Sequence, residues 1–247
     1  MKYATTNKTT FNTYIANFKY IVDGNSIIIE EYIGEDTYVD IPNYIDNKTV
    51  NKIDKRAFAG TSVERVKIPS TVNIIDGMAF MDCNKLEKVI MYDGISDIEI
   101  CAFNGCDSLK EIIIPKTVKS IGTLAFSDCA SLNNIFIENG VQEIGESAFS
   151  FCLKIKNIEI PSSVKIIKDG AFSVCSSLEN VVINNGVKII GKETFSYLNN
   201  ATITIPESVT LIEKDSFRSC ENLMLCVFEN SYAHNYAKEN KIKYRLL

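Results

Sequence analysis

Eight phenylalanines recur at intervals of 22 or 23 residues through most of this chain. They stand at Phe58, Phe80, Phe103, Phe126, Phe149, Phe172, Phe195 and Phe217. A fixed period of this length is typical of a solenoid, in which each repeat stacks on its neighbours and shares one continuous core with them. We therefore predict one elongated domain, whose length counts stacked turns and not separate globular units.

The other apolar residues return in phase with the phenylalanine. The repeat that starts at Ala102 reads Ala-Phe-x-x-Cys-x-x-Leu-x-x-Ile-x-Ile-Pro-x-x-Val-x-x-Ile-Gly. Two branched side chains two residues apart point to the same side of a strand, so the Ile-x-Ile step predicts strands that stack into a continuous parallel sheet. The Phe-x-x-Cys-x-x-Leu segment spaces its apolar residues three apart, which favours a short helical turn on the opposite, convex side.

Both ends of the chain depart from the repeat, as a solenoid requires, because an uncovered end exposes apolar side chains and an unpaired sheet edge. Two β-prone runs around Asp23-Gly24 predict a hairpin. Ser231 can begin a short helix that Asn240 ends, and the alternating residues 242–246 then predict a half-buried strand. The predicted organisation is a loosely ordered leader at 1–16, a capping hairpin and atypical first repeat at 17–56, leucine-rich repeats at 57–228 and a C-terminal cap at 229–247.

Two kinds of turn alternate after the predicted strands. All five prolines directly follow the last strand isoleucine, and from Pro69 onward they occupy every second repeat: Pro42, Pro69, Pro115, Pro161 and Pro206. The intervening repeats carry Asp93-Gly94, Asn139-Gly140 and Asn185-Gly186 instead. Proline fixes φ and removes a hydrogen-bond donor, whereas Asn-Gly accepts positive φ, so the two turns differ in chemistry.

Charge and hydropathy exclude several classes of partner. The net charge is −5 and the pI is near 5.1, which argues against a nucleic-acid partner because its phosphates would be repelled. The chain has no run of eighteen apolar residues, so we do not predict membrane insertion. The first fifteen residues are polar and contain no signal peptide or anchor. A signal removed earlier would leave the same sequence, so the compartment stays open.

Six cysteines occupy the same phase of the repeat: Cys83, Cys106, Cys129, Cys152, Cys175 and Cys220. Stacked side chains with parallel Cβ vectors do not give the torsion of a disulfide, and a straight file cannot surround a zinc ion. We predict buried thiols that act as small core residues. Cys101 and Cys226 lie outside this file, and either could be a reactive or pairing thiol.

No catalytic constellation is present. His234 is the single histidine and, without a partner motif, is predicted to be a surface residue of the capping helix. The chain has no phosphate-cradling glycine loop, nucleophile elbow or metalloprotease helix. We therefore predict a protein that is not an enzyme and that uses no cofactor and no metal.

The outward strand position, between the two core isoleucines, varies most. It runs Lys67, Ile90, Ile113, Phe136, Glu159, Val182 and Thr204. Three successive apolar side chains with a polar flank suit a protein-binding surface, although branched and aromatic residues also simply favour strands and stack in ladders. The predicted binding residues are Lys67, Lys88, Ile90, Ile113, Phe136, Glu159 and Val182. The same exposed face could also pair two copies into a homodimer.

The repeat resembles the BspA-like leucine-rich repeat, whose unit of about 23 residues has the pattern written out above. The resemblance covers roughly residues 39–228, and the tail from Tyr232 to Tyr244 is similar to the usual C-terminal cap of that family. It implies a right-handed leucine-rich-repeat solenoid with a parallel sheet on its inner face. Members are mostly surface or secreted proteins of bacteria and some anaerobic protists that adhere to host proteins and cells.

The resemblance thus implies a cell-surface or secreted adhesion or host-interaction protein with a protein ligand. An intracellular, cytoplasmic scaffold for protein–protein interaction is the alternative. The polar N-terminus and the unpaired thiols favour that alternative, because free thiols suit a reducing compartment.

Overall fold

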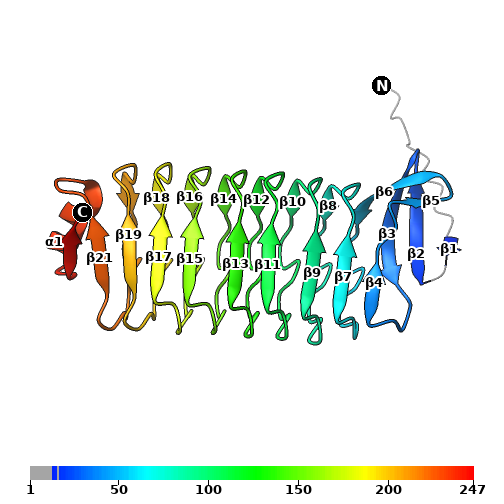
Figure 1. The fold of residues 1–247 in the computed structure, drawn as a ribbon, viewed down its shortest axis with the longest axis horizontal. Helices are drawn as coiled ribbons and strands as arrows, with labels where there is room; N and C mark the ends of the chain where they lie inside the picture. Colours follow the sequence, from blue (N-terminus) through cyan, green and yellow to red (C-terminus); the bar gives the residue numbers. More distant parts are fainter. Residues whose placement is uncertain (1–12, 16) are drawn as a thin grey trace, which may run out of the picture.

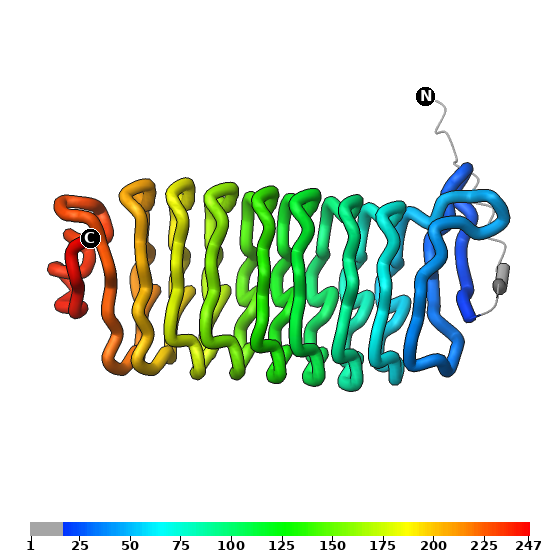
Figure 2. Tube along the Cα trace, viewed as in Figure 1, coloured from blue at the N-terminus to red at the C-terminus, as the bar shows by residue number. Residues whose placement is uncertain are grey.

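The computed structural model describes residues 13–15 and 17–247 and is an elongated rod of stacked turns (Figure 1). The strands run across the long axis, with the N-terminal cap at one end and the helical cap at the other. Each turn of the chain lies beside the next, so residues one repeat apart are neighbours in space (Figure 2). The predicted leucine-rich-repeat solenoid with hairpin and helix caps is confirmed.

The Ile-x-Ile steps form the longer strands, as predicted. Their bounds are β4 (Tyr38–Asp40), β7 (Arg65–Ile68), β9 (Lys88–Met91), β11 (Glu111–Ile114), β13 (Asn134–Ile137), β15 (Asn157–Ile160), β17 (Asn180–Ile183), β19 (Thr202–Ile205) and β21 (Met224–Val227). We call their outer surface the long-strand face. The predicted continuous parallel sheet is wrong in one respect: it is two five-stranded sheets, one running from β4 to β13 and the other from β15 to β22 (Tyr244–Leu246).

The Val-x-x-Ile segments form a second, twelve-stranded sheet that the sequence did not predict. Its strands beyond the N-terminal cap are β6 (Lys48–Ile53), β8 (Ile74–Ile75), β10 (Asp97–Ile98), β12 (Ser120–Ile121), β14 (Glu143–Ile144), β16 (Ile166–Ile167), β18 (Ile189–Ile190) and β20 (Leu211–Ile212), with β5 (Tyr44–Ile45) paired to β6. This sheet continues from β14 to β16, where the longer strands are interrupted. Side chains of both sheets meet in one hydrophobic core.

The segments predicted as helical turns are instead consecutive β-turns. The N–H of Met81 donates to the carbonyl oxygen of Met78 at 3.0 Å, within the same turn. The N–H of Phe80 points the other way, to the carbonyl oxygen of Ala102 in the next turn of the solenoid at 2.7 Å. Met78 and Asp82 have positive φ, 61° and 57°, which reverses the direction of alternate amides and so prevents a continuous helix.

The eight phenylalanines form one stacked column. Seven have no exposed surface, and the ring centroids of Phe58 and Phe80 lie 4.7 Å apart, close to the spacing of about 4.8 Å between neighbouring strands. The column widens to 6.1 Å between Phe195 and Phe217. At its ends Tyr32 stacks on Phe58 at 5.1 Å and Tyr236 meets Phe217 edge-on at 6.0 Å, so the caps extend the column.

Five thiols of the cysteine file are buried in the core, as predicted, whereas Cys220 is only partly buried. Each thiol donates to the carbonyl oxygen of the phenylalanine in the preceding repeat, for example Cys129 to Phe103 at 3.3 Å. Burial raises the pKa of Cys175 from 9.0 to about 12, which keeps the donor proton in place. Cys101 and Cys226 are also buried and unpaired, and Cys226 is covered because β22 packs beside it.

The alternation of proline and glycine turns now has a steric explanation. A Cβ at Gly140 would overlap the carbonyl oxygen of Lys116, the residue after Pro115 in the preceding repeat. The N–H of Gly140 donates to the hydroxyl of Ser163 in the following repeat at 3.0 Å. Gly94 and Gly186 make the same pair of approaches, so each Asx-Gly turn fits between two proline turns.

The N-terminal cap is the predicted hairpin. Strands β2 (Phe18–Asp23) and β3 (Ser26–Tyr32) pair antiparallel around Gly24, and β3 then pairs with β6 to start the twelve-stranded sheet. Residues 13–15, predicted as part of a loosely ordered leader, form β1 (Thr13–Ile15), which pairs with β2. The rest of that leader lies outside the described residues.

The C-terminal cap holds two corrections. Helix α1 (Tyr232–Glu239) has Ser231 as its N-cap and Asn240 as its C-cap, as predicted. His234, however, is buried, with 3% of its surface exposed. Its Nδ1 accepts from the N–H of Asn230 at 3.0 Å, and its ring packs against Tyr244. Strand β22 is exposed along its whole length, not half buried, because it forms the open edge of the sheet.

Candidate protein-binding surface

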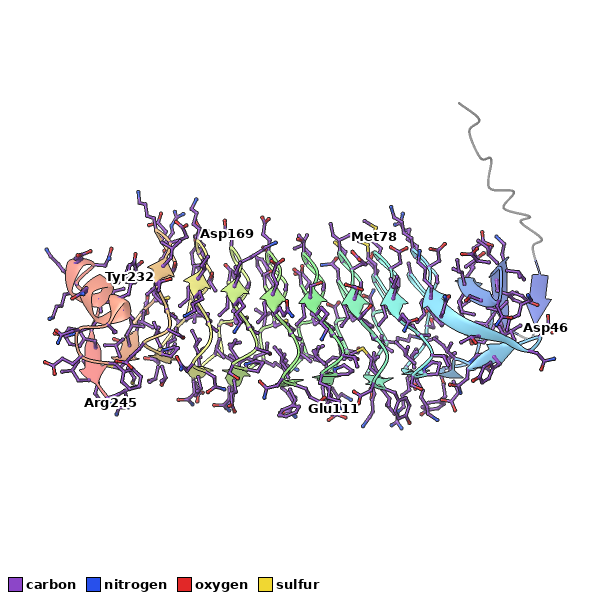
Figure 3. The ribbon with its side chains drawn as sticks, turned by 90° about the horizontal axis from the view of Figure 1, so that it is seen from above. Asp46, Met78, Glu111, Asp169, Tyr232 and Arg245 are labelled. Carbon is purple, nitrogen blue, oxygen red and sulfur yellow. The ribbon has the colours of Figure 1, made fainter. Side chains whose placement is uncertain are left out.

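The structure places all seven predicted binding residues on the long-strand face. Lys67 lies on β7, Lys88 and Ile90 on β9, Ile113 on β11, Phe136 on β13, Glu159 on β15 and Val182 on β17. The four apolar side chains point outward, with 39% of Ile90, 55% of Ile113, 61% of Phe136 and 41% of Val182 exposed. Glu111 lies on the same face. In Figure 3 it is on one side of the rod, and Met78 and Asp169 are on the opposite side.

Strand register brings these residues into two groups. Ile113 lies directly beside Phe136, and Lys67 beside Ile90. Glu159 lies beside Val182 in the second five-stranded sheet. No strand pairing joins the two groups in the described structure, so the predicted surface is a single face with a break between Phe136 and Glu159.

The charged flank is largely neutralised within the face. Lys67 lies 3.6 Å from Asp40, and the Nζ of Lys88 lies 2.6 Å from the Oε1 of Glu111. Such exposed pairs contribute little stability, but they leave these lysines with a carboxylate partner already. Further along, the amide of Asn180 donates to the side-chain oxygen of Asn157 at 2.9 Å.

Pairing between the longer strands alternates along the rod. Four residue pairs join β7 to β9, β11 to β13, β15 to β17 and β19 to β21, whereas one pair joins β9 to β11, three join β17 to β19 and none joins β13 to β15. The complete pairs run from a repeat with proline after its strand to a following repeat without one. The incomplete ones run from a glycine repeat to the next proline repeat.

Proline explains this alternation. After β13 the N–H of Glu138 donates to the carbonyl oxygen of Ile114 at 3.0 Å, and Asn184 donates equally to Ile160 after β17. The corresponding residue after β15 is Pro161, which has no N–H to offer Ile137. At this junction the outward neighbours are also an aromatic ring and a carboxylate, which give no favourable cross-strand contact.

The unpaired β13/β15 junction opens two shallow hollows. One of about 650 Å³ and one of about 400 Å³ adjoin Phe136, and Ile135, Phe136 and Glu159 line both. Ile135 occupies a core phase, yet it is partly exposed, whereas its equivalents Ile112 and Ile158 are 1% and 3% exposed. The repeat pattern could not show this, because Ile135 matches it perfectly.

Two exposed tyrosines extend the face and were missed from sequence. Tyr38 lies on β4 with the guanidinium of Arg65 5.2 Å from its ring centroid, and Tyr92 follows β9 in the phase where other repeats have proline. Extending the outward columns into the atypical first repeat would have found Tyr38. Tyr92 is aromatic where the equivalent residues of the other glycine repeats are Glu138 and Asn184, and that departure was the available signal.

The described residues offer few other chemical centres. No group of three or more histidine, cysteine, aspartate or glutamate side chains within residues 13–15 and 17–247 is arranged to hold a metal ion. Over the same residues, no helix has the length and apolar content needed to cross a bilayer. Lys116, which lines the smaller hollow, is held by Asp93 at 3.1 Å, and the hydrogen bond to that carboxylate raises the pKa of Lys116.

Comparison with known proteins agrees with the geometry. The chain matches the BspA type Leucine rich repeat region, in six copies, over residues 14–123, 51–176 and 96–224. It is similar to a leucine-rich repeat protein of T. pallidum, with 33% identity, 76% of this chain and 89% of that chain covered, and a TM-score of 0.70. No curated protein matches it in sequence.

Two further solved structures share the fold. A leucine-rich repeat protein from Bacteroides ovatus is 27% identical, with 96% of this chain and 67% of that chain covered and a TM-score of 0.61. A leucine rich cell surface protein from Faecalibacterium prausnitzii is 22% identical, with 89% and 76% covered and a TM-score of 0.58.

Proposed function

This chain belongs to the BspA-type leucine-rich repeat family, and we propose that it is a non-catalytic adhesion or host-interaction module, secreted or displayed at the cell surface, that binds a protein partner. The observation that carries this proposal is the row of exposed apolar side chains on successive strands, Ile90, Ile113 and Phe136. Hydrating such a row of apolar side chains is unfavourable in the free protein, and a partner that covers the face removes this unfavourable free energy.

Replacing Ile113 and Phe136 together by aspartate tests the proposal. Binding to a panel of immobilised extracellular-matrix proteins should fall by more than about tenfold, because both side chains lie in the middle of the row. Ile100→Asp is the matched control, since Ile100 is also exposed but follows β10 of the twelve-stranded sheet. Far-ultraviolet circular dichroism should be unchanged in both variants. Binding that survives the double substitution would refute the proposal.

An intracellular scaffold is the second candidate, and the thiols favour it. All eight cysteines are unpaired in the described structure, which suits a reducing compartment. Fractionation of native cells distinguishes the candidates, because protein found only in the cytosol excludes a surface role. The partner could also be a second copy, in which case sedimentation would show a dimer that the double substitution converts to a monomer.

A further inference from the structure

At the β13/β15 junction a core side chain of the long-strand face reaches the surface. Ile135 is partly exposed there between two hollows, with Phe136 beside it. No strand pairing joins β13 to β15, although the twelve-stranded sheet is unbroken behind them. The junction therefore presents an apolar floor and unpaired main-chain groups within a rigid frame, and both gain from a partner that covers them.

We propose that this junction anchors the protein partner and takes an extended segment in which an apolar side chain is flanked by lysine or arginine. The proposal rests on the protein-binding function proposed above. The apolar side chain packs over Ile135 beside Phe136, and the basic side chains meet Glu138 and Glu159, which line the smaller hollow.

The basic character of the segment follows from two carboxylates that lack a close cationic partner among the described residues. Glu138 and Glu159 form no ion pair within the described part of the chain, whereas Glu87, Glu111 and Glu179 each have a lysine partner. The two carboxylates are nonetheless held in place. Glu138 accepts from the N–H of Lys116 at 2.9 Å, and Glu159 accepts from the side chain of Asn184 at 2.8 Å.

The Nζ of Lys116 is bound to Asp93, so it attracts Glu138 only at longer range and forms no ion pair with Glu138 or Glu159. A partner that brings a guanidinium or ammonium group therefore adds an opposite charge at a partly desolvated site, which favours binding and sets its specificity. A second copy of this chain suits the junction less well. A two-fold contact centred there would place Glu138 and Glu159 of both copies together, and like charges repel.

A phage-displayed library of random peptides, selected on the whole protein, tests the proposal. Enriched peptides should carry an aromatic or aliphatic residue next to lysine or arginine. Raising the salt concentration should weaken their binding to the protein. Measured with the synthesised peptides, Glu159→Lys should weaken binding by more than about tenfold, because attraction becomes repulsion. Glu146→Lys is the matched control, an exposed glutamate that follows β14 on the other sheet, and should change binding less than about twofold.

Hydrogen exchange gives a second reading that does not depend on the variants folding identically. The bound peptide should slow exchange of the β13 and β15 amides and leave the amides of β14 and β16 unchanged. Enrichment of acidic or uncharged peptides, or unchanged binding in Glu159→Lys, would overturn the proposal. If peptides bind the Glu159→Lys variant normally but do not bind the Ile113→Asp variant, the proposed anchoring site at the junction is wrong, while the proposed binding face is supported. Failure to enrich any peptide would count against both.

Discussion

The two sheets of the rod are made by the same repeats, yet only one of them is continuous. The twelve-stranded sheet pairs without interruption from β6 to β20, whereas the longer strands stop pairing between β13 and β15. The difference lies in the residue that follows each strand. After the short strands that residue always keeps its N–H, as when Gly145 donates to Ile121 at 2.8 Å and Lys168 to Ile144 at 3.0 Å.

After the longer strands, every second repeat has proline at this position and loses the donor. Stacking of equivalent side chains is therefore not enough to make a continuous sheet: pairing is reduced where proline removes the donor, as at β9/β11 and β17/β19, and is lost at β13/β15, where Phe136 also meets Glu159. In this rod one sheet keeps the turns together, which leaves the other free to open at the surface that we propose binds a partner.

Alkaline pH should unfold the whole rod. The number of unfolding transitions shows whether the segments on either side of the β13/β15 junction unfold together. Burial raises the pKa of Cys175 from 9.0 to about 12. Because the folded state holds this proton more tightly, the contribution is complete below pH 9 and is lost as the pH rises from 9 towards 12. We expect one cooperative loss of circular dichroism, since the twelve-stranded sheet crosses the junction.

Two separate alkaline transitions would mean instead that the rod consists of two independently stable halves. In Cys175→Ala the unfolding free energy should depend less steeply on pH over this range, because one raised thiol pKa has been removed.

Truncating core isoleucines compares the sheets directly. Ile144→Ala in the twelve-stranded sheet should lower the free energy of unfolding by about 2–5 kcal/mol, since Ile144 has no exposed surface. Ile135→Ala should cost about half as much, because its side chain already meets solvent. Urea denaturation measures both. Ile112→Ala, at the equivalent position of β11 with only 1% of its surface exposed, is the control and should resemble Ile144→Ala. Equal losses at all three sites would contradict an open junction.

Restoring the missing donor should give the smallest effect. Pro161→Ala supplies an N–H opposite the carbonyl oxygen of Ile137, so hydrogen exchange of the β15 amides should slow as the junction gains a bond. The free energy of unfolding should change by less than about 1 kcal/mol, because the new bond offsets the greater freedom of the unfolded chain. Unaltered exchange would show that the unfavourable meeting of the Phe136 and Glu159 side chains, and not proline, keeps the strands apart.

The repeat made most of the fold predictable. The phase of each apolar residue located the longer strands, the phenylalanine column and the core thiols, and the hairpin and helix caps followed from local turn and capping signals. The second sheet was missed because a strand such as Ile74–Ile75 is too short to show any alternation. His234 was missed because its burial depends on how the cap folds, with the ring of Tyr244 packed against it.

For the candidate site, the outward column at Ile90, Ile113 and Phe136 could be read from the alternation of the strand. The hollows beside Ile135 could not be predicted, because this residue is an isoleucine like its buried equivalents Ile112 and Ile158.

The sequence by itself determined which side chains stack in columns, since the repeat length and the phase of each residue decide what points inward. Only the tertiary structure decided where the stacked turns are bonded and where they part. A hydrogen bond between turns depends on a donor from one repeat meeting an acceptor from another, and no single repeat contains both.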